Sequence, residues 1–176
     1  MRQVVLAAAF LAFTIAAKLA HADDPCAAFT WDVRHERSLF SQRPQSLAAG
    51  QTLPTAPAIV IERLYQLELQ AQTEVAFPAI PGKPPKSAGA YAGLVKLTVD
   101  APGVYRISLD QPVWVDVVQN GTTIAADGFQ GRKGCSAPHK IVEFLLPAGI
   151  PLTLQFSGSN AAVVKTTVTR SPRATS

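Results

Sequence analysis

Apolar and polar residues alternate along most of the chain after residue 91, and a period of two is typical of β-strands with one buried face. Proline, glycine and Asn-Gly turn signals divide this pattern into short pieces. Asp100–Gly103 is expected to turn the chain back into a return strand. Asn120-Gly121 is expected to close a two-residue hairpin, because both residues tolerate positive φ. The expected strands are residues 95–99, 105–109, 113–118, 122–125, 141–146, 152–156 and 163–168.

The first half of the chain has a weaker pattern. Residues 65–71 alternate cleanly and predict one further strand. Residues 30–41 predict a short helix, with Thr30 as its N-cap and Asp32 in its first turn. The segments expected to be surface loops are the Ser/Pro/Ala-rich residues 42–57, the proline-rich residues 78–90 and the glycine-rich residues 127–140.

Seven to nine short strands with little helix predict an all-β fold. We expect an antiparallel β-sandwich with jelly-roll-like connections and a short N-terminal helix. A weak internal repeat is also present, because residues 97–109 and 144–156 both read as strand, Pro/Gly turn, strand. One domain is expected over residues 23–170, followed by a disordered tail at residues 171–176.

The N-terminus predicts export. Arg2 precedes an uncharged apolar run, residues 4–17, and Ala20-His21-Ala22 supplies the small residues of a cleavage site. This is the build of a secretory signal peptide at residues 1–22, and the apolar run is too short to span a bilayer comfortably. Removing 22 of the 176 residues leaves 154, enough for one domain with a core. We expect a periplasmic or secreted protein without membrane insertion.

Charge excludes one class of partner. The formal net charge is +4, and it falls to +2 once Arg2 and Lys18 leave with the signal peptide. Such a small and scattered excess does not favour nucleic acid as a partner.

Cys26 and Cys135 are the two cysteines of the chain. In an oxidising compartment they are expected to form one disulfide that ties the N-terminal segment to a late loop. A closed loop of this length stabilises a fold by about 4–5 kcal/mol in the chain-entropy model. The alternative is a pair of free thiols that act as metal ligands or as a nucleophile, which export disfavours.

The sequence gives little support for a catalytic function. The mature chain keeps His35 and His139, and an iron site could be assembled from them with Glu36 or Glu143. The two histidines lie far apart in sequence and form no His-x-His or His-x-x-x-His pair. A Gly-x-Ser-x-Gly elbow and a phosphate loop are also missing. We therefore assign no catalytic residue, no metal ligand and no cofactor.

Trp114 and Asp116 are the first binding candidates. They alternate with Val113, Val115 and Val117, so they point outward if the valines face the core. An exposed tryptophan beside a carboxylate suits a sugar, which offers apolar faces and hydrogen-bonding groups. The alternative is that the N-terminal segment covers Trp114.

The loop before residue 141 is the second candidate. Arg132, Lys133 and His139 could bind an anion there with help from exposed amides, or the loop could simply be held in place by the disulfide. The partners that we consider are an envelope glycan, a small ligand or an envelope protein.

Several stretches resemble a family of small exported bacterial proteins of unknown function. They are Tyr91–Val95, Gly103–Asp110, Trp114–Val118, Phe129–Gly131 and Gly134–Phe144. Some members of that family are labelled homogentisate 1,2-dioxygenase, which implies a metal-dependent oxygenase using His35 and His139 as an alternative function. Those dioxygenases are much longer cupin-type enzymes, and their iron-binding histidine pattern is absent here. The layout also resembles pre-peptidase C-terminal β-sandwich domains, which implies a non-catalytic binding or accessory module of the cell envelope.

Overall fold

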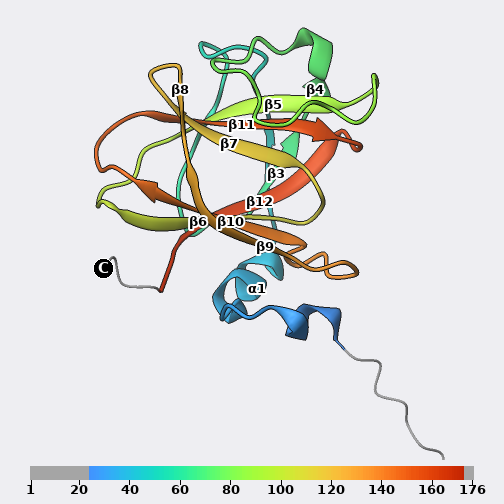
Figure 1. The fold of residues 1–176 in the computed structure, drawn as a ribbon, viewed down its shortest axis with the longest axis vertical. Helices are drawn as coiled ribbons and strands as arrows, with labels where there is room; N and C mark the ends of the chain where they lie inside the picture. The colour runs from blue at the N-terminus through green and yellow to red at the C-terminus, as the bar shows by residue number, and fades with distance from the viewer. Residues whose placement is uncertain (1–23, 173–176) are drawn as a thin grey trace, which may run out of the picture.

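The computed structural model describes residues 24–172, so the expected signal peptide lies outside the described residues. Two β-sheets pack face to face (Figure 1). Sheet A contains, in spatial order, β1 (Gln45–Ala48), β3 (Tyr65–Glu68), β12 (Val163–Arg170), β6 (Gly103–Leu109), β10 (Lys140–Leu146) and β9 (Ala126–Gly131). Sheet B contains β2 (Ala58–Ile59), β5 (Tyr91–Leu97), β11 (Leu152–Ser159), β7 (Trp114–Gln119) and β8 (Thr122–Ile124), with β4 (Gln70–Ala71) also paired to β5.

In the part of the chain that the structure describes, helical structure is confined to three short pieces. They are α1 (Arg34–Phe40) and the 3-10 turns η1 (Pro25–Ala28) and η2 (Gln72–Glu74). Figure 1 shows α1 against the outer side of sheet A, near β9, β10 and β12. The prediction of an all-β sandwich with a short N-terminal helix is confirmed.

The core lies between the sheets and is built by the predicted alternation. Val115 and Val117 of β7 are buried with Leu154 and Phe156 of β11, which pairs beside it, and all four face sheet A. Burying side chains of this size stabilises the fold by roughly 1.5–3 kcal/mol each, relative to leaving them exposed. These rows fix which face of each strand is the inner one.

The connection between β5 and β6 differs from the prediction. Asp100–Gly103 was expected to form a hairpin turn, but β5 belongs to sheet B and β6 to sheet A. The chain crosses from β10 to β11 in the same way, so the internal repeat is a repeat of two sheet-to-sheet crossings. Apolar alternation specifies the buried face of a strand and says nothing about its neighbour.

The Asn120-Gly121 hairpin is confirmed. Asn120 has φ 49° and Gly121 has φ 78°, and Gln119 pairs with Thr122 across the turn. Both values lie in the left-handed region that a two-residue hairpin requires.

Residues 24–172 contain twelve strands, more than the seven to nine expected. The additional strands are short or lie at sheet edges: β1 falls within the expected loop 42–57, and β9 starts just before the expected loop 127–140 and runs into it. Two edge pairs, β1 with β3 and β2 with β5, are parallel. Edge strands expose much of their length, so their side chains need not alternate.

Three further boundaries differ from those expected from the sequence. The helix starts at Arg34, and Asp32 Oδ1 rather than a Thr30 cap accepts from the Arg34 backbone N–H (3.1 Å). Residues 65–71 divide between β3 and β4, which lie in different sheets. Ser171, expected in the tail, is buried and its backbone N–H donates to Val104 O (2.9 Å).

A disulfide joins Cys26 to Cys135, as predicted. It holds the N-terminal segment against sheet A, where Phe29 and Val33 bury Ile141 from the outside. No helix within residues 24–172 is long and apolar enough to cross a membrane.

Candidate functional site

A cleft of about 460 Å³ lies where the chain crosses from sheet B to sheet A. Strand β8 pairs with β7 in sheet B, and after Ala125 the chain continues as β9, which pairs with β10 in sheet A. A strand that changes sheets in this way forms a corner of the sandwich. The residues that line the cleft come from this corner, from both faces of β7, from β10, from the end of β11 and from the loop 78–90. They are Lys83, Pro84, Lys86, Pro112, Val113, Trp114, Val115, Asp116, Thr123, Ile124, Ala125, Ala126, Phe129, Lys140, Val142, Phe144, Ser157, Gly158 and Asn160.

Trp114 and Asp116, both predicted as binding residues, lie together in this cleft on the outer face of β7. The Trp114 indole N–H donates to Asp116 Oδ1 (2.8 Å). Oδ2 of the same carboxylate accepts from Gln155 Nε2 (3.0 Å) and from the Gly82 backbone N–H (3.1 Å). Asp116 is buried, and its oxygens already accept three protein hydrogen bonds. Its physical role is therefore to orient the indole and to hold the loop.

The cover over Trp114 is the proline-rich loop 78–90. A Cβ on Gly82 would lie 3.1 Å from Trp114 Nε1 and 2.9 Å from Asp116 Oδ1, so the loop backbone passes directly over this pair. The sequence analysis had offered the N-terminal segment as the alternative cover. That segment lies on sheet A instead, where Trp31 packs against Arg106.

Two lysine ammonium groups lie near the Trp114 ring. Lys140 Nζ is 4.9 Å from the ring centroid, and Lys83 Nζ is 5.7 Å from it. Lys140 Nζ also donates to Val113 O (3.3 Å). Burial, followed by the positive charge of Lys83, lowers the pKa of Lys140, while Asp116 acts in the opposite direction. The positive charge at this point is only partly compensated.

Phe129 is an aromatic side chain on the inner face of sheet A that is nevertheless 72% exposed. It pairs across the sheet with Val142, a core residue, and cross-strand partners share a face. The core residues beside it are covered, but at the β8–β9 corner nothing of sheet B reaches over this ring. The cleft is therefore an opening into the interior of the sandwich with an apolar wall.

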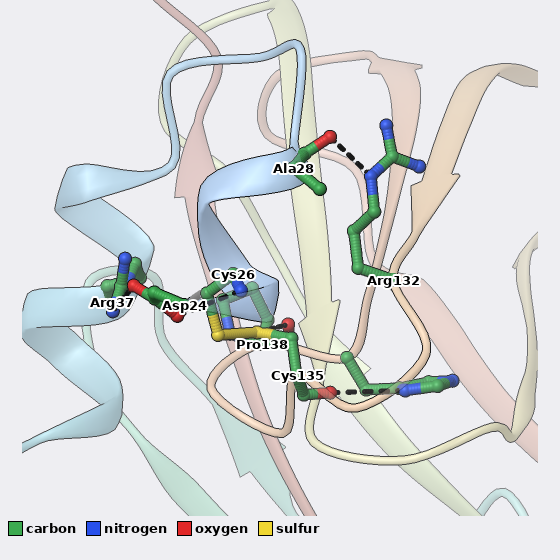
Figure 2. The surroundings of a disulfide bond; sticks show 8 residues. Asp24, Cys26, Ala28, Arg37, Arg132, Cys135 and Pro138 are labelled. Carbon is green, nitrogen blue, oxygen red and sulfur yellow. Dashed lines mark hydrogen bonds and ion pairs between the residues drawn. A yellow bond between two sulfur atoms is a disulfide. The ribbon is translucent and has the colours of Figure 1, made fainter. Parts of the chain in front are cut away.

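Of the other predicted binding residues, Arg132 lies near the disulfide (Figure 2). Arg132 Nε donates to Ala28 O, and the guanidinium lies 5.4 Å from the Phe29 ring centroid. His139 Nδ1 lies 3.2 Å from Cys135 O. Lys133 is exposed. Arg132 therefore helps to fasten the N-terminal segment, whereas His139 contacts the disulfide loop itself, and none of the three lines the cleft.

A second polar cluster lies under α1. Arg106 on β6 is 2% exposed and binds Glu143 Oε1 through Nε (2.9 Å) and Glu36 Oε1 through Nη1 (3.1 Å). Thr169 donates to the Glu36 carboxylate (3.0 Å), and Ser171 to that of Glu143 (2.9 Å). Buried ions need such partners, because desolvation strongly disfavours an unpaired charge.

The hypothetical iron ligands are not brought together. Glu36 and Glu143 both bind Arg106, whereas His35 contacts Glu62 and His139 contacts the disulfide loop. Within residues 24–172 no group of three or more His, Cys, Asp or Glu side chains could hold a metal ion.

Sequence reasoning found Trp114 and Asp116 but did not assign Phe129, Lys83 or Lys140 to the cleft. The exposure of Phe129 follows from strand register and from the place where sheet B ends, and neither is visible in the sequence. Lys140 could be found once Val142 and Phe144 are known to face inward, because a residue two positions before Val142 shares that face.

Comparison with known proteins gives no further information about the function of this cleft. No protein-family model, no curated protein and no solved structure matches this chain.

Proposed function

We propose that this protein is an exported, non-catalytic binding module that holds a small molecule in the cleft at the β8–β9 corner. The observation that carries the proposal is Phe129, an inner-face aromatic residue exposed in a cleft of about 460 Å³. Ligand sites in proteins have comparable volumes, and most are lined by apolar and aromatic side chains with a few polar groups. The cleft combines these features.

The composition of the cleft favours binding over catalysis. Its ionisable side chains are lysines and Asp116, and Asp116 is occupied by Trp114, Gln155 and Gly82. The same occupancy favours a small ligand over an envelope glycan, because the carboxylate expected to accept sugar hydroxyls is already satisfied.

Export rests on two features. The first 22 residues have the build of a signal peptide, and Cys26 and Cys135 form a disulfide that suits an oxidising compartment. Expression of the full chain in a Gram-negative host should give a periplasmic product whose N-terminus is Asp23. A cytoplasmic product that retains residues 1–22 would refute the export proposal.

A neutral environment-sensitive dye such as prodan tests the cleft. We expect saturable binding of one dye per protein, weakened at least about tenfold in Phe129→Ser, because covering a phenyl ring is worth roughly 1.5–3 kcal/mol. Leu145→Ser is the matched control: Leu145 is 57% exposed, lies on the neighbouring strand β10 and does not line the cleft. Equal binding by both variants, or no binding by the wild type, would overturn the proposal.

A further inference from the structure

The lysines of the cleft have no ion-pair partner among the described residues. Within residues 24–172 the ion pairs are made by arginines and by His35, and none of them contains Lys83, Lys86 or Lys140. All three lysines nevertheless line the same cleft. A group of like charges is repulsive unless an opposite charge lies between them.

Lys140 is placed unusually for a lysine. It begins β10, and side chains alternate along a strand, so it shares the inner face with Val142 and Phe144. Its ammonium group lies in the cleft near Trp114, where burial disfavours the charged form. Lys140 Nζ donates to Val113 O and lies over the Trp114 ring, and neither contact brings a negative charge to the ammonium group.

Asp116, the only carboxylate among the described residues that line the cleft, is a poor partner for two ammonium groups. Asp116 is held by Trp114 Nε1, Gln155 Nε2 and Gly82 N, and it lies beneath the loop 78–90. It contributes a favourable charge to Lys140 but cannot neutralise both Lys140 and Lys83. Room for a second negative charge therefore remains beside Trp114.

The apolar side of the cleft completes the description of the ligand. Phe129 is 72% exposed, and Val142, Phe144 and Ile124 line the cleft with it. A ligand that covers Phe129 from the corner of the sandwich can at the same time place a polar end near Lys140, because Phe129 and Lys140 lie on the same inner face of adjacent strands. The two ends of the cleft differ in chemistry, apolar at Phe129 and cationic at Trp114.

We propose that the cleft binds a small amphiphilic anion, namely an apolar carboxylate whose body covers Phe129 and whose carboxylate lies between Lys140 and Lys83. This inference rests on the proposed function and adds the ligand class. Charge-assisted hydrogen bonds from ammonium to carboxylate are about twice as strong as neutral ones, and more so where water is partly excluded. The ligand carboxylate supplies the negative charge that the cleft lacks.

Calorimetric titration of the full mature protein tests the ligand class with matched pairs of probes. Decanoate is compared with decanamide, and naphthoate with naphthamide, so that each pair differs only in charge. We expect each carboxylate to bind at least about tenfold more tightly than its amide. The pair with the higher affinity tells whether the apolar body is a chain or a ring.

Substitutions test which side chains produce the preference for the carboxylate. Lys140→Met and Lys83→Met should each remove most of the preference for the carboxylate while leaving amide affinity within about twofold, and Phe129→Ser should weaken acid and amide alike. Lys96→Met is the control, because Lys96 lies in sheet B on β5 and does not line the cleft. It should retain the preference of the wild type.

The outcomes separate the two proposals. Equal affinity for carboxylate and amide, both lost in Phe129→Ser, would refute the anionic ligand and leave the binding cleft standing. A preference for the carboxylate that persists in Lys140→Met and Lys83→Met would also refute the inference, since the charge would then be recognised elsewhere. Absence of binding by all four probes would count against the small-molecule cleft itself.

Discussion

Lys140 shows how a single charged residue in the cleft affects stability. Burial, and then the charge of Lys83, lower the pKa of its ammonium group in the folded protein, whereas the unfolded chain keeps a value near 10.5. Between the lowered pKa and 10.5 the unfolded state therefore binds more protons than the folded state. In that interval the free energy of unfolding rises with pH, and below it the charge destabilises the fold.

Lys140→Met should remove this contribution. We expect the stability of the wild type to rise relative to that of Lys140→Met as the pH increases from the lowered pKa of Lys140 towards 10.5, because the methionine does not titrate. Urea unfolding of both proteins over a series of pH values measures the difference. A difference that does not change with pH would show that burial leaves the ammonium group unaffected.

Arg106 is the other residue whose surroundings make a sharp prediction. Its removal in Arg106→Leu leaves the carboxylates of Glu36 and Glu143 buried without their cation. We expect a loss of about 3–5 kcal/mol in the free energy of unfolding, measured by urea denaturation. Arg34→Ala is the contrasting variant, because the Arg34–Asp32 pair lies at the surface with 89% of the Arg34 side chain exposed. It should leave the urea midpoint unchanged.

At the scale of elements, the proline-rich loop 78–90 belongs to the site. It contains no strand, as predicted, but it is pinned to β7 through the Gly82 backbone N–H and Asp116. The loop therefore presents Lys83 to the Trp114 ring. Proline explains why the segment stays out of the sheet, and only the hydrogen bond to Asp116 explains where it rests.

Gly82→Ala should detach this loop. The added Cβ would lie 2.9 Å from Asp116 Oδ1, so either the loop or the carboxylate must move. We expect faster proteolysis within residues 78–90, a shift in Trp114 fluorescence in a Trp31→Phe background, and weaker binding of a carboxylate probe.

Gly89→Ala is the matched control, because a Cβ there meets no atom within 4 Å. Both variants make the same chemical change in the same loop. If they behave alike, contact with Asp116 does not hold the loop.

The strands also show which parts of a fold the alternation of apolar and polar residues can predict. The strands β6, β7 and β10 to β12 were predicted closely, because each alternates strongly and has a face that is buried against the other sheet. The expected strand 95–99 overlaps β5 only at residues 95–97. The short strands β1 and β4 and the edge strand β9 were missed or misplaced. Their pairing depends on backbone hydrogen bonds to a neighbour, and these carry no side-chain period.

At the scale of the whole molecule, the disulfide makes the N-terminal segment part of the sandwich. Cys26 and Cys135 are 109 residues apart, and the segment between Cys26 and α1 covers the Arg106 cluster on the outer side of sheet A. Arg132 adds a second tie through Ala28 O (Figure 2). The cleft lies elsewhere, at the β8–β9 corner.

The double variant Cys26→Ser/Cys135→Ser should lose up to about 4–5 kcal/mol of unfolding free energy, because the unfolded chain is no longer constrained. Urea unfolding measures the loss, and wild type under reducing conditions should match the double variant. Carboxylate binding by the folded fraction should persist, since no residue of the disulfide lines the cleft. Full stability without the disulfide would mean that the other contacts of the segment, the packing of Phe29 and Val33 and the hydrogen bonds from Arg132 and Arg106, are sufficient to hold it.

The sequence alone determined the class of fold, the hairpin at Asn120-Gly121, the pairing of the two cysteines and the outward direction of Trp114. Each follows from local chemistry: side-chain period, positive φ, two thiols in a chain that is expected to be exported, and alternation along one strand. Only the tertiary structure decided which sheet each strand joins, and therefore that the chain changes sheets between β8 and β9 and leaves Phe129 uncovered there. The position of such a cleft depends on where the edge of one sheet lies relative to the edge of the other. Long-range packing fixes that position, and no single stretch of sequence encodes it.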